Sequence, residues 1–404
     1  MNDQALVDGF DVNELTTEFL EDPFPTYRAL RELDPIHRNK DGSYFLTRYA
    51  DLELAYKHPA MSSDKKVDFK RNMGDGPLYL HHTTSLVFND DPYHARVRKL
   101  MAGAFTPRKL AELEPIIERV ITDLVGKLRG RETFDLMDDF ALVLPTEIIA
   151  DMLGVDERTK PLLRDYSLTI LGGLETALTD EAREAGDKAV AEFGAYLQDL
   201  IDHRRKNPDE GGRGEVLAAL IFGEVAGETL SDVELVQNCI FLLNAGHETT
   251  ANLTANAICC LMDHPDQMRR LRDDPGLIDT AVDETLRYES SVQLGNRKLT
   301  EDVDMNGTTV PKDAYLHLAI GGANRDPAKF SDPEKFDIGR TPNPHLAFAW
   351  GKHICLGATL AKIEGRHAVG KFIQGFETIE PAGVRERVLR ARFRGYRHAP
   401  VRVS

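Results

Sequence analysis

Near its C-terminal end the chain reads Phe348-Ala349-Trp350-Gly351-Lys352-His353-Ile354-Cys355-Leu356-Gly357, which places one cysteine on a glycine-lined turn directly before a predicted helix. The N-terminus of a helix presents unpaired N–H groups and a partial positive charge, so it favours the ionised form of a nearby thiol. Gly351 and Gly357 omit side chains where the backbone must bend or approach a flat group closely. The stretch therefore predicts a thiolate site at Cys355.

The composition describes one large acidic protein. Its 404 residues include no Pro-, Gly- or Ser-rich linker, so we expect residues 1–404 to form a single domain with subregions. The formal net charge of −16 argues against nucleic acid or an anionic membrane as the main partner. No secretion signal is recognisable, and no stretch reaches the roughly 18 apolar residues that span a bilayer. We therefore expect a soluble, cytoplasmic protein.

The other three cysteines show no sign of a disulfide framework or a zinc site. Cys239, Cys259 and Cys260 fall in an apolar helical pattern, and two of them are adjacent. The spacings that zinc sites use are missing. We expect all three to pack in the core.

Helical patterns dominate the chain and extended segments are few, so we expect a mainly α fold with a small β region. The β-rich subregions lie at about 36–48 and 292–320, and Asn306-Gly307 is typical of a hairpin turn. Residues 58–93 lack periodicity, and we expect a long irregular loop there. The expected helices are 21–33, 49–57, 94–104, 107–129, 143–153, 157–171, 180–206, 215–220, 231–263, 277–288 and 355–376.

The longest predicted helix, residues 231–263, is a natural central axis of the fold. Ser231 and Glu234 form a capping box at its start, and His264-Pro265 stops it. Its interior contains Ala245-Gly246-His247-Glu248-Thr249-Thr250, which weakens a helix because glycine costs about 1 kcal/mol against alanine and threonines compete for backbone carbonyls. A sequence that accepts such a cost indicates a function at this string.

The two stretches resemble the haem-ligand loop and the oxygen-activation motif of cytochromes P450, whose iron is held by a cysteine thiolate. One position departs from the family pattern, because Ala349 stands where a glycine usually follows the phenylalanine. The resemblance implies the cytochrome P450 fold, with haem b between the long central helix and the Cys-ligand loop 348–357. It also implies that Cys355 is the iron ligand.

The same resemblance implies roles for the neighbours of Cys355 and for the central helix. Phe348, Gly351 and Gly357 would contact the haem from the cysteine side, and Ala245 would do so from the central helix. Glu248 and Thr249 would be catalytic, because in the family the acid and the hydroxyl steer protons to dioxygen.

Glu284 and Arg287 are three residues apart, so they share a helix face and can pair. Considered alone, such a pair is a solvated surface bridge worth a few tenths of a kcal/mol. In cytochromes P450 this spacing marks a buried structural pair joined by a later arginine, and Arg340 matches that third member. The resemblance therefore implies a buried network of Glu284, Arg287 and Arg340.

A haem carries two propionates, which need cations or strong donors when they are buried. His94 and Arg98 lie four residues apart on one predicted helix and match the family's propionate-binding helix. Arg297 and His353 match the other two positions. Four matches in order imply that these residues hold the propionates.

The substrate pocket is predicted from the same helix and from two further segments. Counting back from Thr249 along the helix nominates Ala245, Asn244 and Phe241 as one wall, and the resemblance adds Val292 and Leu294. Leu86 and Val87 are expected to reach the pocket from the long irregular loop. The wall is mostly apolar, as small-molecule sites are. Asn244 is the exception, and it could either hydrogen-bond a substrate oxygen or hold a water. Residues 68–85 and the junction Gly172-Gly173 are the expected mobile covers.

Electrons must come from another protein, because the chain contains no nucleotide-binding or iron–sulfur motif. Arg96, Arg98, Lys99, Arg108 and Lys109 form a run without an acidic residue between them. In the family a small acidic iron–sulfur ferredoxin docks at such a patch, and this steering weakens with salt. The alternative is an ordinary solvated helix face.

These patterns together predict a monomeric monooxygenase of the cytochrome P450 family. It would hydroxylate or O-dealkylate a small to medium apolar organic substrate with O2, using two electrons from a ferredoxin and an NAD(P)H-dependent reductase. One alternative is a peroxygenase that uses hydrogen peroxide directly. Another is a non-catalytic haem protein that binds a gas or transfers electrons.

Overall fold

The computed structural model describes residues 2–174, 178–210 and 213–404. Contacts divide the chain into two compact units. Unit 1 comprises residues 1–62, 124–141 and 249–404, and unit 2 comprises residues 63–123 and 142–248. The mainly α class with a small β region is confirmed.

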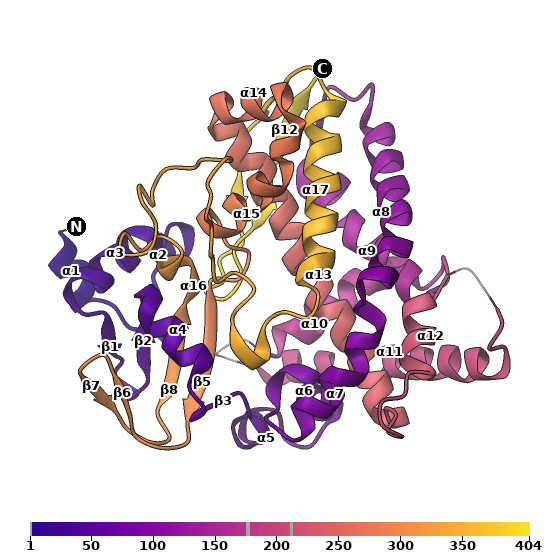
Figure 1. Ribbon diagram of the computed structural model, residues 1–404, viewed down its shortest axis with the longest axis horizontal. Helices are drawn as coiled ribbons and strands as arrows, with labels where there is room; N and C mark the ends of the chain where they lie inside the picture. Colours follow the sequence, from indigo (N-terminus) through magenta and orange to yellow (C-terminus); the bar gives the residue numbers. More distant parts are fainter. Residues whose placement is uncertain (1, 175–177, 211–212) are drawn as a thin grey trace. The chain divides into compact units, whose positions relative to one another are not determined.

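Unit 1 contains the larger β structure. Its main sheet has the strand order β1-β2-β8-β5-β3, formed by Ile36–Arg38, Tyr44–Leu46, Tyr315–Ala319, Leu294–Leu299 and Met61–Ser62. Only β2 and β8 are parallel, with Leu46 opposite Leu318. Helices α1 (Asp3–Asp8), α2 (Thr17–Glu21), α3 (Phe24–Leu33), α4 (Tyr49–Lys57) and α16 (Ile320–Ala323) accompany this sheet (Figure 1).

The predicted hairpin is present in unit 1. Strands β6 (Val303–Met305) and β7 (Thr308–Val310) pair with Val303 opposite Val310. The turn residues Asn306 and Gly307 have φ values of 53° and 97°, which an Asn-Gly turn of this type requires.

A further group of helices in unit 1 comes from the C-terminal half of the chain. It contains α14 (Pro265–Asp273), α15 (Ile278–Tyr288) and α17 (Ala358–Gly375), and α15 packs beside α17. Short strands β4 (Thr133–Asp135), β12 (Pro400–Val403) and β9 (Ile379–Pro381) form one further sheet, and β10 (Glu386–Arg387) pairs with β11 (Tyr396–His398). The helix α14 and these strands were not expected from the sequence.

Unit 2 is almost entirely helical. It includes α5 (Lys66–Met73), α6 (Pro77–Thr84), η1 (Leu86–Phe88), α7 (Tyr93–Ala102), η2 (Gly103–Phe105), α9 (Val143–Leu153), η4 (Lys160–Leu162), α10 (Leu163–Gly172), α11 (Asp180–Lys206) and α12 (Glu215–Ile221). The boundary between the units falls inside α8 (Pro107–Leu128) and inside α13 (Asp232–Asp263).

The expectation of a long irregular loop over residues 58–93 is wrong, because α5, α6 and η1 occupy most of it. Gly74, with φ of 74°, ends α5, and Pro77 opens α6. The glycine and proline residues that indicate a loop in the sequence are therefore a helix C-cap and the start of the next helix. The cap of α6 comes from another helix, since Asp187 of α11 accepts a hydrogen bond from the Leu78 N–H at 2.8 Å. The sequence around α6 holds no local sign of it.

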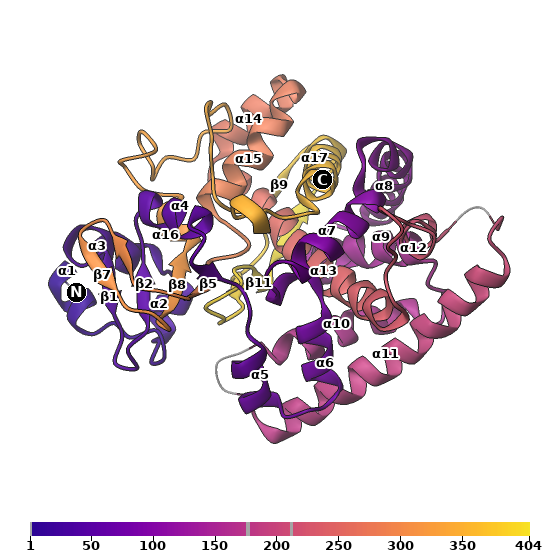
Figure 2. The ribbon, with the colours of Figure 1, turned by 60° about the horizontal axis from the view of Figure 1, so that its bottom comes forward.

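The mobile cover expected at residues 68–85 is therefore built from helices that pack. Leu78 of α6 is buried, and a Cβ at Gly173 or Gly186 would lie 2.8 or 2.9 Å from its Cδ2 atom. The two glycines let α6 approach α10 and α11 closely, as Figure 2 illustrates. Gly173, predicted as part of the other cover, is the C-cap of α10.

Candidate functional site

Cys355 lies in unit 1 on a short loop that precedes α17. The Cys355 N–H donates to the Phe348 carbonyl at 2.9 Å, which closes the loop around the 3-10 turn η6 (Gly351–His353). The helix begins at Ala358 with Gly357 as its N-cap, three residues later than the sequence suggested. Cys355 is exposed, whereas Cys239, Cys259 and Cys260 are buried as expected.

Burial separates the chemistry of the four cysteines. It raises the pKa of Cys239 to about 12 and of Cys259 to about 11, and it raises the pKa of Cys260 as well. These three thiols therefore stay protonated near neutral pH and are poor metal ligands. Cys355 is the cysteine suited to hold iron.

Two residues of the ligand loop have a left-handed backbone. Gly351 has φ of 72°, and a Cβ there would lie 2.5 Å from the Tyr56 carbonyl oxygen of α4, so both conformation and space require glycine. Ala349 has φ of 58° although it carries a Cβ. The turn thus keeps the backbone that a glycine would adopt, at a cost of about 1–2 kcal/mol. Phe348 packs beside the buried cluster of Leu253, Val282 and Leu286.

The start of α13 confirms the capping box. The Ser231 N–H donates to Glu234 Oε2 at 2.9 Å, and the Glu234 N–H donates to Ser231 Oγ at 3.3 Å. Further along, Ala245 is exposed, and Phe241 and Thr249 are partly exposed, although their neighbours Asn244 and Glu248 are buried. Phe241, Ala245 and Thr249 follow at intervals of four, and Leu242 and Gly246 beside them are also partly exposed, so one strip of the helix is open.

The open strip of α13 and the exposed thiol of unit 1 each have the chemistry that a haem requires. A flat cofactor needs small or apolar side chains on one helix face and an accessible sulfur, and the chain supplies both. If α13 were buried on all sides, Ala245 would be buried as well.

The four residues matched to the propionates lie on three elements. In unit 2, His94 and Arg98 are one turn apart on α7, and His94 Nδ1 lies 3.6 Å from Asp91. Burial and, after it, the Arg98 guanidinium lower the pKa of His94. In unit 1, Arg297 lies on β5 with its guanidinium 5.2 Å from the Tyr56 ring centre, and His353 ends η6.

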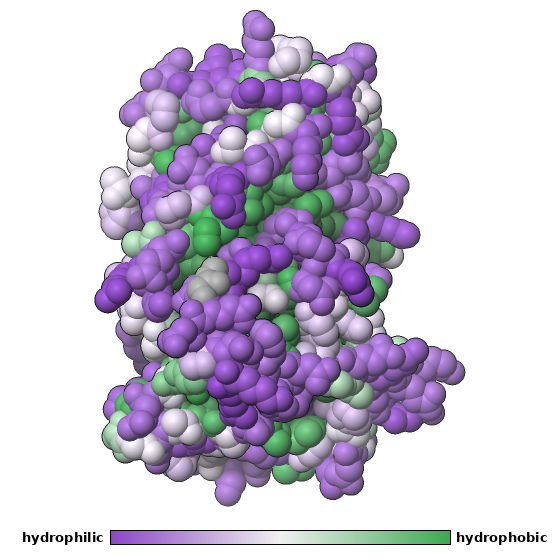
Figure 3. Space-filling model, turned by 90° about the vertical axis from the view of Figure 1, so that its right-hand side faces the viewer, coloured by the Kyte–Doolittle hydropathy of each residue, from purple (hydrophilic) through white to green (hydrophobic). Residues whose placement is uncertain are grey.

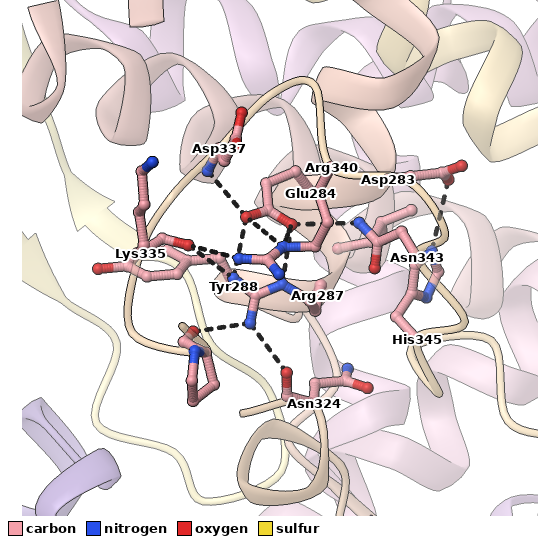
Figure 4. Close-up of polar contacts among 12 residues, drawn as sticks. Asp283, Glu284, Arg287, Tyr288, Asn324, Lys335, Asp337, Arg340, Asn343 and His345 are labelled. Atoms are coloured by element: carbon pink, nitrogen blue, oxygen red, sulfur yellow. Dashed lines mark hydrogen bonds and ion pairs between the residues drawn. The ribbon is translucent and has the colours of Figure 1, made fainter. Parts of the chain in front are cut away.

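Glu284 and Arg287 of α15 form a fully buried ion pair, as Figure 4 shows. Glu284 accepts from Arg287 Nε at 2.8 Å and Nη2 at 2.9 Å, and from Arg340 Nε at 3.1 Å. The remaining donors of Arg287 bind the carbonyls of Asn324, Pro333 and Lys335. All five N–H groups of Arg287 are therefore used. These hydrogen bonds hold the irregular segment 324–344, which leads to the ligand loop, against α15.

The predicted pocket residues are distributed over both units. In unit 2, Leu86 is buried with its N–H bonded to Asn238 Oδ1 at 3.0 Å, and Val87 is 37% exposed. In unit 1, Val292 is partly buried, and Leu294 belongs to a core cluster that includes Phe45 and Ala319.

Asn244 takes part in a buried polar chain that the sequence did not predict. Its Nδ2 donates to His81 Nε2 at 3.1 Å, and His81 Nδ1 lies 3.1 Å from Gln237 Oε1. Burial lowers the pKa of His81 to about 4, so the ring is neutral. Because the amide nitrogen can only donate, Nε2 is the acceptor and Nδ1 carries the proton. Asn244 Oδ1 is buried without a partner among the described residues.

The basic run of α7 and α8 is partly neutralised in unit 2. Arg96 pairs with Glu234, and Arg108 and Lys109 both pair with Glu112. Lys99 is exposed. The surface seen in Figure 3 is mainly hydrophilic with smaller hydrophobic patches. In the part of the chain that the structure describes, no helix combines the length and apolarity of a membrane span.

Comparison with known proteins assigns these features to one family. The cytochrome P450 family model matches residues 31–275 and 276–391. A biotin biosynthesis cytochrome P450 of Bacillus subtilis (strain 168) is 32% identical over 91% of this chain and 92% of its own length. Vitamin D(3) 25-hydroxylase of Pseudonocardia autotrophica is 36% identical over 87% of this chain and 86% of its own length.

Solved structures agree with the sequence relatives. The crystal structure of P450BioI in complex with hexadec-9Z-enoic acid ligated acyl carrier protein superposes with a TM-score of 0.90 at 32% identity, covering 96% of this chain and 99% of that one. The chain therefore belongs to the cytochrome P450 family and is a monooxygenase whose cofactor is haem b ligated by a cysteine thiolate.

Proposed function

We propose that Cys355 is the iron ligand and that this protein hydroxylates or O-dealkylates a small to medium apolar molecule. The exposure of this one thiol, at the closed turn before α17, carries the assignment. When bound, the haem supplies the chemistry that inserts one oxygen atom of O2 into a C–H bond, while the other leaves as water and two electrons and two protons are consumed. His94, Arg98, Arg297 and His353 would hold the propionates, and Phe348, Gly351, Gly357 and Ala245 would contact the ring.

The protein must deliver the two protons and exclude other water. Thr249 lies on the open strip of α13 and is suited to hold a proton near the reacting oxygen. Glu248 is the residue before Thr249 and is buried. Its carboxyl group can accept protons that come from solvent and pass them to the Thr249 hydroxyl. A protein that used hydrogen peroxide directly would not need this pair, because peroxide brings its own protons.

Substitution of Thr249 tests the proton delivery. The Thr249→Ala variant should keep consuming reduced nicotinamide but should form less hydroxylated product and more hydrogen peroxide. Thr250→Ala is the matched control, because Thr250 is buried beside it and should leave the coupling unchanged. Undiminished coupling in Thr249→Ala, or full turnover with hydrogen peroxide alone, would favour the peroxygenase.

We also propose a ferredoxin as the electron donor, with an NAD(P)H-dependent reductase behind it. Lys99 and Arg108 are both exposed members of the basic run, but Arg108 pairs with Glu112, as Lys109 does, and Arg96 pairs with Glu234. Lys99→Glu should therefore weaken ferredoxin binding several-fold at low ionic strength, and the difference should shrink in salt. Equal ferredoxin affinities at low salt would place the docking surface elsewhere.

The buried polar chain refines the substrate class. Asn244 already donates to His81, so its remaining atom is a carbonyl oxygen that can only accept. Leaving that oxygen unsatisfied costs about 1–3 kcal/mol, and a hydroxyl or N–H of a bound molecule would recover it. We propose an apolar substrate with one hydrogen-bond donor, and not one whose only polar group is a ketone or ether.

Matched ligands test this refinement. Testosterone and androstenedione differ in a hydroxyl and a ketone at one carbon, and dodecan-1-ol and dodecane differ in a single hydroxyl. The alcohol of each pair should bind more tightly, measured by the spin-state change of the haem. Asn244→Leu should remove the preference, and a preference that survives in this variant would contradict the proposal.

A further inference from the structure

The last turn of α4 meets both the ligand loop and the strand that carries Arg297. The Tyr56 carbonyl is one of the carbonyls that a helix end leaves without an intrahelical partner, and it lies against Gly351 so closely that no Cβ fits there. The next residue, Lys57, has its ammonium 5.2 Å from the ring centre of Trp350. Two consecutive residues of α4 therefore fix the turn that precedes Cys355.

The side chain of Tyr56 reaches the other way, to β5. Its ring is buried and lies 5.2 Å from the Arg297 guanidinium, within the range of a cation–π contact. Its hydroxyl extends over Gly295, where a Cβ would lie 2.8 Å from the oxygen. Gly295 and Arg297 are two residues apart on one strand and so face the same side. The ring thus lies along this face of β5 and supports the guanidinium.

The hydroxyl of Tyr56 does not explain why a tyrosine is here. It has no hydrogen-bond partner among the described residues, and burial raises the pKa of Tyr56 to about 12. The features that make contacts are the flat ring and the backbone carbonyl. A phenylalanine would keep both, and a leucine would keep only the carbonyl.

We infer that Tyr56 is a positioning residue, which orients Arg297 through its ring and seats the Cys355 loop through its backbone. The inference rests on the proposed assignment of Cys355 as iron ligand and Arg297 as propionate partner. Tyr56 itself touches neither the substrate nor the iron in this scheme. Its effect on the haem passes through Arg297.

The test measures the rate of haem transfer from the holoenzyme to excess apomyoglobin. Tyr56→Leu should raise this rate by about two- to thirty-fold, the range of a cation–π contact, and Tyr56→Phe should leave it within a factor of about two. In an Arg297→Gln background the further change Tyr56→Leu should have no additional effect. Tyr49→Leu is the matched control, because Tyr49 is a second buried tyrosine of α4 that contacts Phe330 and Pro344, and its effect should multiply with that of Arg297→Gln.

A second experiment avoids removing the ring. Gly295→Ala places a methyl group against the Tyr56 hydroxyl and should displace the ring, which raises the rate of haem loss. Adding Tyr56→Phe removes that hydroxyl and should restore the original rate. A merely structural defect at Gly295 would not be rescued in this way.

The outcomes separate the inference from the proposal beneath it. The positioning role is wrong if the effects of Tyr56→Leu and Arg297→Gln on the rate of haem loss multiply in the double variant. It is also wrong if Tyr56→Phe does not restore the rate of haem loss in Gly295→Ala. The haem assignment stands in both cases. If Arg297→Gln alone leaves haem loss unchanged, the propionate assignment fails. Loss of the thiolate spectrum in Cys355→Ser is independent of both.

Discussion

Two buried polar networks in this protein differ in one respect. In unit 1, Arg287 uses all five of its N–H groups on Glu284 and three backbone carbonyls. In unit 2, the chain Gln237–His81–Asn244 ends in an Asn244 oxygen that has no partner among the described residues. The Arg287 guanidinium satisfies all its donors and so stabilises the fold, although Asn343 at the edge of that network keeps a buried Oδ1 without a partner among the described residues. In unit 2 the remaining acceptor belongs to a predicted pocket residue, so it is suited to a ligand. The difference predicts responses of different size to truncation.

The largest effect is expected where the closed network is broken. Arg287→Ala leaves Glu284 buried with only Arg340 as a charged partner, which should lower the free energy of unfolding by about 3–5 kcal/mol and yield little haem-loaded protein. Haem content per chain after purification, together with denaturant unfolding, measures it. Arg287→Lys is the control, because it keeps the charge but loses the planar guanidinium. Its free energy of unfolding and its haem content should lie between those of wild type and Arg287→Ala. Normal haem incorporation in Arg287→Ala would contradict a structural role.

A second closed network predicts sensitivity to acid. Burial opposes ionisation of Glu289, but Arg394, Arg387 and Arg325 outweigh it and lower its pKa to about 2. Because the folded pKa lies below the unfolded value of about 4.5, the ion pairs stabilise fully above pH 4.5, and this contribution is lost as the pH falls towards 2. Unfolding measured from pH 7 to pH 3 should show wild type losing stability more steeply than Glu289→Gln below pH 4.5.

Glu364 is a buried glutamate whose pKa shifts in the opposite direction to that of Glu289. It is buried in α17, its Oε2 atom lacks a partner among the described residues, and burial raises its pKa to about 8. Its folded pKa lies above the unfolded value, so the folded state loses stability as the pH rises from about 4.5 to 8. Glu364→Gln should therefore gain stability relative to wild type across that window. Parallel pH profiles for the two glutamine variants would mean that their surroundings do not differ as described.

The unit 2 chain predicts a smaller change. Asn244→Leu removes the unsatisfied oxygen with little change in volume but leaves His81 Nε2 without its donor, so the two effects offset each other and the free energy of unfolding should stay within about 1 kcal/mol of wild type. Denaturant unfolding of the ligand-free holoenzyme measures it, with His81→Ala as the comparison that opens a cavity and should destabilise. A loss above about 2 kcal/mol for Asn244→Leu would show that the Asn244 side chain is needed for stability.

The smallest effect concerns the ligand loop. Ala349→Gly relieves a left-handed alanine but makes the unfolded chain more flexible, so it should raise the free energy of unfolding by less than about 1 kcal/mol. The carbon monoxide spectrum should not change, because the backbone of the turn is already the one that glycine adopts. A destabilised Ala349→Gly variant would mean that the Ala349 methyl group packs usefully against the neighbouring core cluster.

The sequence predicted the elements that local signals define. Helices α4, α9 and α11 have the bounds that periodicity indicated, and Ser231 and Asn306-Gly307 behave as their local chemistry requires. The sequence did not predict the elements whose formation depends on residues far away along the chain. The α6 helix depends on Asp187 of another helix for its cap, and the final short strands depend on partners far along the chain.

The candidate site divides in the same way. Cys355, the Glu284–Arg287 spacing and the open strip of α13 are visible as local patterns. The contacts of His81 with Asn244 and of Tyr56 with Arg297 join residues from distant parts of the chain, and no local pattern marks them. The loop spacing likewise could not reveal that Ala349 adopts a left-handed backbone.

Every role assigned to the haem site depends on ligation of the haem iron by the thiolate of Cys355. The most direct test is the absorption spectrum of the reduced protein with carbon monoxide, for wild type and for Cys355→Ser. We expect the strongly red-shifted band of a thiolate complex in wild type and its loss in the variant. A wild-type spectrum without that band, or a variant that retains it, would contradict the account.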